Sequence, residues 1–145
     1  PTFDRSKYGS AEGAAKGAYV LADTEGTPDV ILIGTGSEVQ LAVEAAKTLA
    51  SEGVAARVVS MPCREWFAEQ DESYRESVLP EAVKARVSVE AGIAMPWRDI
   101  VGDAGVSVSL EHFGASAPYE RLYQEFGITA EAVADAARAS IKKAR

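Results

Sequence analysis

The chain has 145 residues, with 15 Lys and Arg against 22 Asp and Glu, and a formal net charge of −7. Hydrophobic residues make up 47% of it, enough to bury a core, which excludes a disordered chain and favours one globular domain. The acidic balance excludes nucleic acid as the main partner, because a nucleic-acid binder clusters its cations. The one basic cluster, at Lys142, Lys143 and Arg145, is typical of a helix C-terminus.

The chain contains one cysteine, Cys63, and one histidine, His112. A single cysteine cannot form an internal disulfide, which favours a reducing compartment, and two such residues cannot supply the ligands of a structural zinc site. No apolar run is long enough to cross a bilayer and no signal peptide is visible. We therefore expect no membrane partner and a cytoplasmic location.

Residues 1–17 are rich in Gly, Ser and Lys and show no sustained period, which predicts a linker or lead-in. The chain also begins at Pro1 without an initiating Met, as a processed protein or a piece of a longer one would. We expect a single domain over residues 18–145.

Strand and helix patterns alternate along that domain. Short β-branched or alternating runs predict strands at 18–21, 30–33, 55–61, 85–89 and 106–110. Helices are predicted between Ser37 and Gly53, over 64–79 as one or two short pieces, and at 97–101, 117–126 and 130–143. The alternation predicts an α/β domain with a mostly parallel sheet and helices on both faces.

Two helices carry recognisable end signals. Ser37 and Gln40 predict a capping box at the start of the first long helix, and Gly53 a left-handed stop at its end. Its apolar face is expected to contain Val39, Ala42, Val43, Ala46, Leu49 and Ala50, with Glu38, Gln40, Glu44, Lys47 and Ser51 on the polar face. Thr129 predicts the cap of the last helix, with Glu131 in its first turn.

Ligands of open α/β sheets bind beyond the carboxyl ends of the strands. Four segments fall there: 34–37, 61–63, 90–92 and 111–114. The first opens like a dinucleotide fingerprint, but Val39 occupies the third glycine position; a tight strand-to-helix turn is the favoured interpretation, and an anion site the alternative. The residues of the candidate ligand edge are Gly34, Thr35, Gly36, Ser37, Glu90 and His112.

Other reactive side chains have structural interpretations that we favour. His112 beside Glu111 could act as a general base, but a lone histidine in a loop is more often structural, and Cys63 fits a partly buried small hydrophobe better than a reactive thiol. The acids of the 64–79 stretch fit a solvated face better than a cation site: Glu65, Glu69, Asp71, Glu72 and Glu76. The residue types alone show no complete active site.

Five motifs occur in the order and spacing of one known family. They are Pro28–Val39 (PDVILIGTGSEV), Arg57–Pro62 (RVVSMP), Gln70–Pro80 (QDESYRESVLP), Val89–Gly92 (VEAG) and Phe113–Pro118 (FGASAP). Together they cover nearly the whole chain, which resembles the third, C-terminal domain of a bacterial-type transketolase. The lead-in Pro1–Arg5 is similar to the connector that leaves the middle domain of that family.

The resemblance implies a three-layer αβα domain whose five-stranded mixed sheet has an antiparallel first strand, here Ala18–Leu21. It also implies a parent homodimeric enzyme of three domains, which moves a two-carbon ketol unit between sugar phosphates with thiamine diphosphate and a divalent cation (Mg²⁺). The third domain then contacts the upstream domains and a second subunit, and its role is usually described as stability, dimer contacts or regulation.

The resemblance assigns no catalytic, cofactor-binding or metal residue to this chain. The family's diphosphate and metal site needs Gly-Asp-Gly followed by Asn; Gly102-Asp103-Ala104-Gly105 is a near miss, and the chain contains no Asn. His112 stands where the family often has a small polar residue. We expect the isolated chain to be inactive and without cofactor. The alternatives are a free-standing anion-binding or regulatory module at Gly34–Ser37, and the equivalent domain of a ketoacid dehydrogenase or deoxyxylulose phosphate synthase.

Overall fold

The computed structural model describes residues 11–90, 98–109 and 129–145. Within them the strands are β1 (Tyr19–Ala22), β2 (Val30–Gly34), β3 (Ala56–Ser60), β4 (Arg86–Glu90) and β5 (Val106–Ser109). The helices are α1 (Val39–Ser51), α2 (Arg64–Ala68), α3 (Glu72–Val78), α4 (Arg98–Val101) and α6 (Ala130–Ala144), with 3-10 helices η1 (Ala11–Lys16) and η2 (Gly36–Glu38). The predicted helix 117–126 and His112 lie outside the described residues.

The five strands form one sheet in the order β1-β3-β2-β4-β5. The strands β3, β2, β4 and β5 run parallel to their neighbours, whereas β1 pairs antiparallel with β3. At the centre Leu32 of β2 is in register with Val58 on one side and Val87 on the other. The predicted α/β class is thereby confirmed, together with the mixed sheet and its antiparallel first strand.

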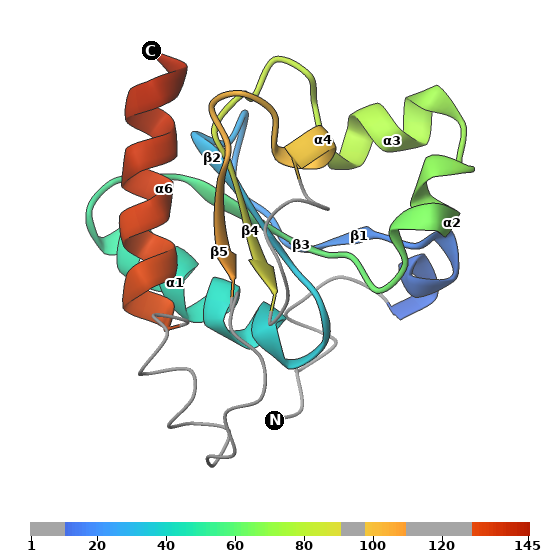
Figure 1. Ribbon diagram of the computed structural model, residues 1–145, viewed down its shortest axis with the longest axis horizontal. Coiled ribbons are helices and arrows are strands. Elements are labelled where there is room, and N and C mark those ends of the chain that lie inside the picture. Colours follow the sequence, from blue (N-terminus) through green and yellow to red (C-terminus); the bar gives the residue numbers. More distant parts are fainter. Residues whose placement is uncertain (1–10, 91–97, 110–128) are drawn as a thin grey trace.

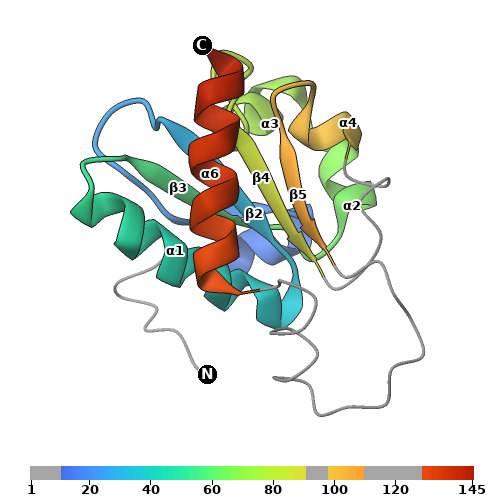
Figure 2. The same cartoon turned by 60° about the vertical axis from the view of Figure 1, so that its left-hand side comes forward.

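Helices cover both faces of the sheet. Figure 2 shows α1 and α6 side by side on one face, with α2, α3 and α4 on the other. Side chains of the buried strand β2 pack on both faces of the sheet, because successive side chains of a strand point to opposite faces. Leu32 packs with Leu49 and Val133 under α1 and α6, and Ile33 packs with Phe67 on the other face. This double burial explains why β2 is a continuous apolar run rather than an alternating one.

The start of α1 differs from the prediction. Residues 36–38 form a 3-10 turn, so the N-cap of α1 is Glu38, in a helical conformation and without a side-chain cap bond. The structure therefore places the N-cap of α1 one residue after the predicted Ser37. Glu38, expected on the polar face, is only 7% exposed. The stop at Gly53 is confirmed by its positive φ of 81°.

The buried face of α1 differs from the predicted apolar face at two alanines. Ala45 is buried, and Ala50, expected on the apolar face, is exposed. Alanine satisfies either environment, because its single methyl group adds little hydrophobic free energy on burial and costs little when exposed. Periodicity therefore places the larger side chains Val39, Val43 and Leu49 correctly and leaves the alanines undecided.

The remaining predicted elements of the described residues are confirmed, most of them to within one or two residues. The 64–79 stretch is two short helices, and Thr129 caps α6 by accepting a hydrogen bond from the backbone N–H of Ala132 at 3.1 Å. One helical turn arises where none was predicted, since Ala11–Lys16 of the lead-in forms η1. Among the described residues, no helix is both long and apolar enough to span a membrane.

Candidate functional site

The parallel pairing of β2, β3 and β4 places some residues of the predicted ligand edge side by side. Gly34 at the end of β2 is in register with Ser60 of β3 and Val89 of β4, so segments 34–37 and 61–63 and Glu90 lie at one edge of the sheet. A hydrogen bond from the N–H of Met61 to the carbonyl of Gly34, 2.9 Å long, joins the first two segments. His112 and the rest of its segment, and residues 91 and 92, lie outside the described residues.

Both glycines of this edge have a steric reason to be glycine. A Cβ on Gly34 would lie 2.7 Å from Cα of Val39, closer than side-chain atoms approach a backbone. Gly36 has a φ of +53°, the left-handed region that favours glycine. Between them Thr35 accepts a hydrogen bond from the N–H of Glu38 at 3.0 Å, which closes the turn. A tight turn therefore accounts for both residues without any ligand.

The charge at this turn is unfavourable for an anion. Glu38 is buried, and its Oε2 would lie 3.6 Å from a Cβ on Gly36, so its carboxylate occupies the space beside the loop. The buried side chain of Glu38 therefore takes up room beside Gly36 that a bound anion would need. The anion-binding interpretation of Gly34–Ser37 remains a prediction, and the geometry does not favour it.

Cys63 and the acids of α2 and α3 also have local roles. The Cys63 thiol, half-buried, donates a hydrogen bond to Oε2 of Glu65 at 3.5 Å. Asp71 caps α3 by accepting a hydrogen bond from the N–H of Tyr74 at 3.0 Å, and this bond holds the pKa of the Asp71 carboxyl below its usual range. All five acids predicted to form a solvated face are exposed: Glu65, Glu69, Asp71, Glu72 and Glu76. Within the described ranges no three His, Cys, Asp or Glu side chains are grouped to hold a metal ion.

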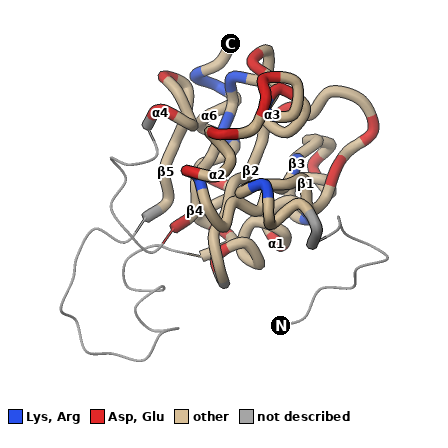
Figure 3. The backbone as a smooth tube through the Cα atoms, turned by 90° about the vertical axis from the view of Figure 1, so that its right-hand side faces the viewer, with Lys and Arg blue, Asp and Glu red and all other residues tan. Residues whose placement is uncertain are grey.

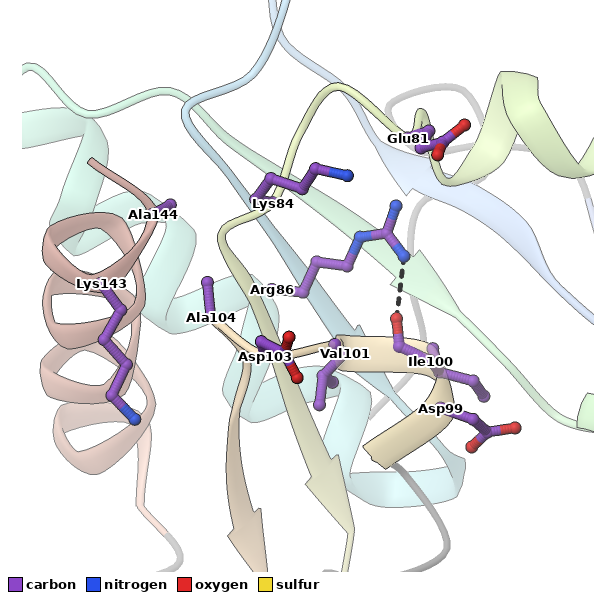
Figure 4. A pocket seen from close by; sticks show the side chains of 11 residues that line it. Glu81, Lys84, Arg86, Asp99, Ile100, Val101, Asp103, Ala104, Lys143 and Ala144 are labelled. Carbon is purple, nitrogen blue, oxygen red and sulfur yellow. Dashed lines mark hydrogen bonds between the residues drawn. The ribbon is translucent and has the colours of Figure 1, made fainter.

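Two neighbouring hollows of the described residues meet at Arg86, at the start of β4, and one of them extends under α2 and α3. One cavity of about 450 Å³ is lined by Lys84, Arg86, Asp103 and Lys143 among others, and an adjoining one of about 380 Å³ by Phe67 and Leu79 among others. Both are lined by Arg86 and Ile100. Figure 4 shows the first of the two cavities. Of this edge, the sequence motifs had indicated only the turn at Gly102–Gly105.

Arg86 forms the wall between the two cavities and joins four loop and helix carbonyls. Its guanidinium donates to Val83 at 3.1 Å, Ile100 at 2.8 Å, Leu79 at 3.3 Å and Pro80 at 2.9 Å. Burial lowers the pKa of this guanidinium, and the carboxylates of Glu76 and Glu81 oppose the shift. With these donors engaged, Arg86 holds the α3–β4 connection against α4 rather than presenting its charge to a ligand. A charged residue at the start of a strand whose central residues are buried was the available sequence signal.

The same edge carries the near miss to the diphosphate and metal motif. Gly102 has a φ of +75°, and the N–H of Gly105 donates to the carbonyl of Gly102 at 3.1 Å, so residues 102–105 form a tight turn between α4 and β5. Asp103 is exposed on this turn. Among the described residues around this turn, no three His, Cys, Asp or Glu side chains are grouped.

Comparison with known proteins gives one consistent result. A family model described as the transketolase-like TK C-terminal domain matches residues 17–129. The transketolase of Mycobacterium tuberculosis (strain H37Rv) is 57% identical over 136 residues, covering 90% of this chain but 19% of that protein. The chain thus spans about a fifth of the length of the curated relatives it matches.

Solved structures agree with the sequence matches. Transketolase from Leishmania mexicana superposes with a TM-score of 0.83 at 44% identity, covering 90% of this chain and 19% of that one. Transketolase from Pichia stipitis, solved in complex with sedoheptulose-7-phosphate, superposes with a TM-score of 0.83 at 37% identity, covering 94% of this chain and 19% of that one.

Proposed function

This chain belongs to the transketolase family, in which it is the C-terminal domain, and we propose that it serves a longer enzyme that transfers a two-carbon ketol unit between sugar phosphates. The observation that carries the proposal is the match of residues 17–129 to the family's C-terminal domain within relatives about five times longer. The sugar-phosphate substrate class is supported by the Pichia stipitis relative, whose structure contains sedoheptulose-7-phosphate.

The cofactors of that longer enzyme are thiamine diphosphate and a divalent cation, Mg²⁺, bound outside this chain. Two features support their placement in the upstream domains: the described residues group no metal ligands, and the turn at Gly102–Gly105 is closed on itself. The partners are the upstream domains and a second subunit, with a cytoplasmic location for the assembly. The isolated 145-residue chain serves stability, dimer contacts or regulation and performs no ketol transfer.

The experiment compares the purified 145-residue chain with the full-length enzyme that contains it. The full-length enzyme should transfer the ketol unit from xylulose-5-phosphate to ribose-5-phosphate in the presence of thiamine diphosphate and Mg²⁺. The 145-residue chain should show no turnover and no calorimetric heat with the cofactor and Mg²⁺. Turnover by the pure short chain would contradict the proposal, and so would a full-length protein that folds and binds cofactor but transfers no ketol unit.

A further inference from the structure

One large apolar side chain of the described residues stands out at the surface, Trp66 on α2. It is 53% exposed, while its neighbour Phe67 is turned inward and is 7% exposed. An exposed tryptophan is costly to leave in water and is the residue type most often found at the energetic centre of a protein interface. Its position therefore requires an account beyond the packing of this domain.

Trp66 lies where the chain enters the domain. Gly17 is packed against α2 so closely that a Cβ on it would lie 2.9 Å from Cβ of Trp66, and the carbonyl of Gly17 accepts a hydrogen bond from the N–H of Cys63 at 3.1 Å. The 3-10 helix η1, which leads into Gly17, is in contact with α2, as Figure 1 shows. Residues 11–16, which come directly before the family domain, thus lie against the helix that carries Trp66.

The surroundings of Trp66 are acidic. Glu69 follows Trp66 by one helical turn and lies beside it on the helix surface, and Glu65 precedes it in the sequence; both are exposed. Residues 64–78 hold five acidic side chains and two arginines, and Figure 3, which faces this side, shows the acids distributed along α2 and α3. The arginines have partners within the domain, since Arg64 pairs with Asp99 at 2.6 Å and Nε of Arg75 donates to the carbonyl of Gln70 at 3.0 Å.

We propose that the Trp66 face, defined as Trp66 with Glu65 and Glu69, docks a basic, partly apolar surface of the domain that precedes this one in the longer enzyme. The inference rests on the proposed function, because that function supplies the preceding domain. The aromatic ring provides the apolar centre of the contact and the two carboxylates a rim that selects cations. A second copy of this chain is a poorer occupant, because it would bring the same acids against these ones.

The test is hydrogen exchange of segments 11–16 and 62–69, compared between the full-length enzyme and the 145-residue chain. We expect slower exchange of both segments in the full-length enzyme, by about tenfold or more if Trp66 is a typical interface centre. Equal exchange in the two proteins would overturn the proposal. Protection that appears in the 145-residue chain as its concentration rises would overturn it in favour of a second copy.

Variants separate docking from folding. In the full-length enzyme, Trp66→Ala and the double variant Glu65→Gln with Glu69→Gln should each remove most of that protection, whereas Glu44→Gln, exposed on α1, should leave it unchanged. In the 145-residue chain the same variants should leave the urea midpoint nearly unchanged, because their side chains are largely exposed there. Protection that survives both variants would overturn the proposal. Ketol transfer tests the proposed function separately, since an active enzyme with an uncovered Trp66 contradicts this inference alone.

Discussion

Gly17 shows how one residue can decide whether the chain enters the domain correctly. Its φ of +87° is in the left-handed region, and a Cβ there would lie 2.2 Å from the carbonyl oxygen of Cys63 and 2.3 Å from the backbone nitrogen of Phe67. Both obstacles are backbone atoms, which cannot move aside without unwinding the start of α2. Composition marks Gly17 only as one glycine of a flexible lead-in, so its constraint is visible in the tertiary structure alone.

Gly17→Ala should therefore lower the free energy of unfolding by more than the left-handed backbone conformation alone explains. The control is Gly53→Ala, which has a similar φ of +81° and nothing within 4 Å of the new Cβ. Gly53→Ala should lower the free energy of unfolding by about 1–2 kcal/mol, the cost of a left-handed alanine. Gly17→Ala should lower it by about 3 kcal/mol or more, because a backbone clash is added. Urea unfolding measures both, and equal losses would contradict the steric argument.

At the scale of the element, α3 has seven residues, and its stability depends on its N-cap residue, Asp71. Helices this short are marginal in isolation, so satisfied end groups contribute a large share of their stability. The carboxylate of Asp71 accepts a hydrogen bond from the N–H of Tyr74, and also one from the hydroxyl of Ser73 at 3.1 Å. The hydrogen bond from Tyr74, followed by that from Ser73, lowers the pKa of Asp71 from its ordinary 3.8.

This lowered pKa predicts a direction for the pH dependence of stability. A carboxyl whose pKa is lower in the folded than in the unfolded state stabilises the fold above about pH 5, and the contribution is lost as pH falls through the folded pKa, below 3.8. Asp71→Asn keeps a capping oxygen but removes the titration, so its urea midpoint should fall less steeply between pH 5 and about pH 3 than that of the wild type. The control is Thr27→Ser, an exposed substitution that removes no ionisable group, which should leave the slope unchanged. Parallel curves for wild type and Asp71→Asn would contradict the prediction.

At the scale of the whole molecule, one strand connects two hydrophobic layers. Leu32 belongs to the cluster under α1 and α6, and Ile33 to the cluster under α2 and α3, and both are fully buried. The layers share the backbone of β2, which is hydrogen-bonded to β3 and β4 on its two sides. Damage to either layer should therefore be transmitted to the whole sheet.

Leu32→Ala and Ile33→Ala should each lower the free energy of unfolding by about 2–5 kcal/mol, the range for cavities left in a well-packed core. The control Leu41→Ala, half-buried on α1, should cost about 1 kcal/mol, because it returns less apolar surface to water. Tryptophan fluorescence and far-UV circular dichroism should give coincident transitions in every variant. Separate transitions for the two layers would show that they unfold independently and would contradict their coupling through β2.

The sequence predicted most of what depends on local periodicity. The apolar run Val30–Ile33 indicated a strand buried on both faces, and Thr129 marked the start of α6, because side-chain pattern and capping chemistry act over a few residues. It predicted the cap of α1 wrongly, since the choice between a capping box at Ser37 and a 3-10 turn ending at Glu38 depends on how closely Gly34 packs against Val39. The candidate edge at Gly34 and Glu90 was located correctly as an edge, because the carboxyl ends of parallel strands must meet there.

By itself the sequence determined the class of the fold, the order of its elements and, through five ordered motifs, its family. Only the tertiary structure decided which polar side chains link residues far apart in the chain. Arg86 joins the carbonyls of the α3–β4 connection to that of Ile100 in α4. The buried hydroxyl of Ser140 on α6 accepts a hydrogen bond from the N–H of Arg86 at 2.9 Å and donates one to the carbonyl of Ala104 at 2.6 Å. Tertiary structure likewise placed the exposed Trp66 beside the entry of the chain. Such contacts depend on three-dimensional proximity between residues far apart in the chain, and that proximity is fixed by packing rather than by local pattern.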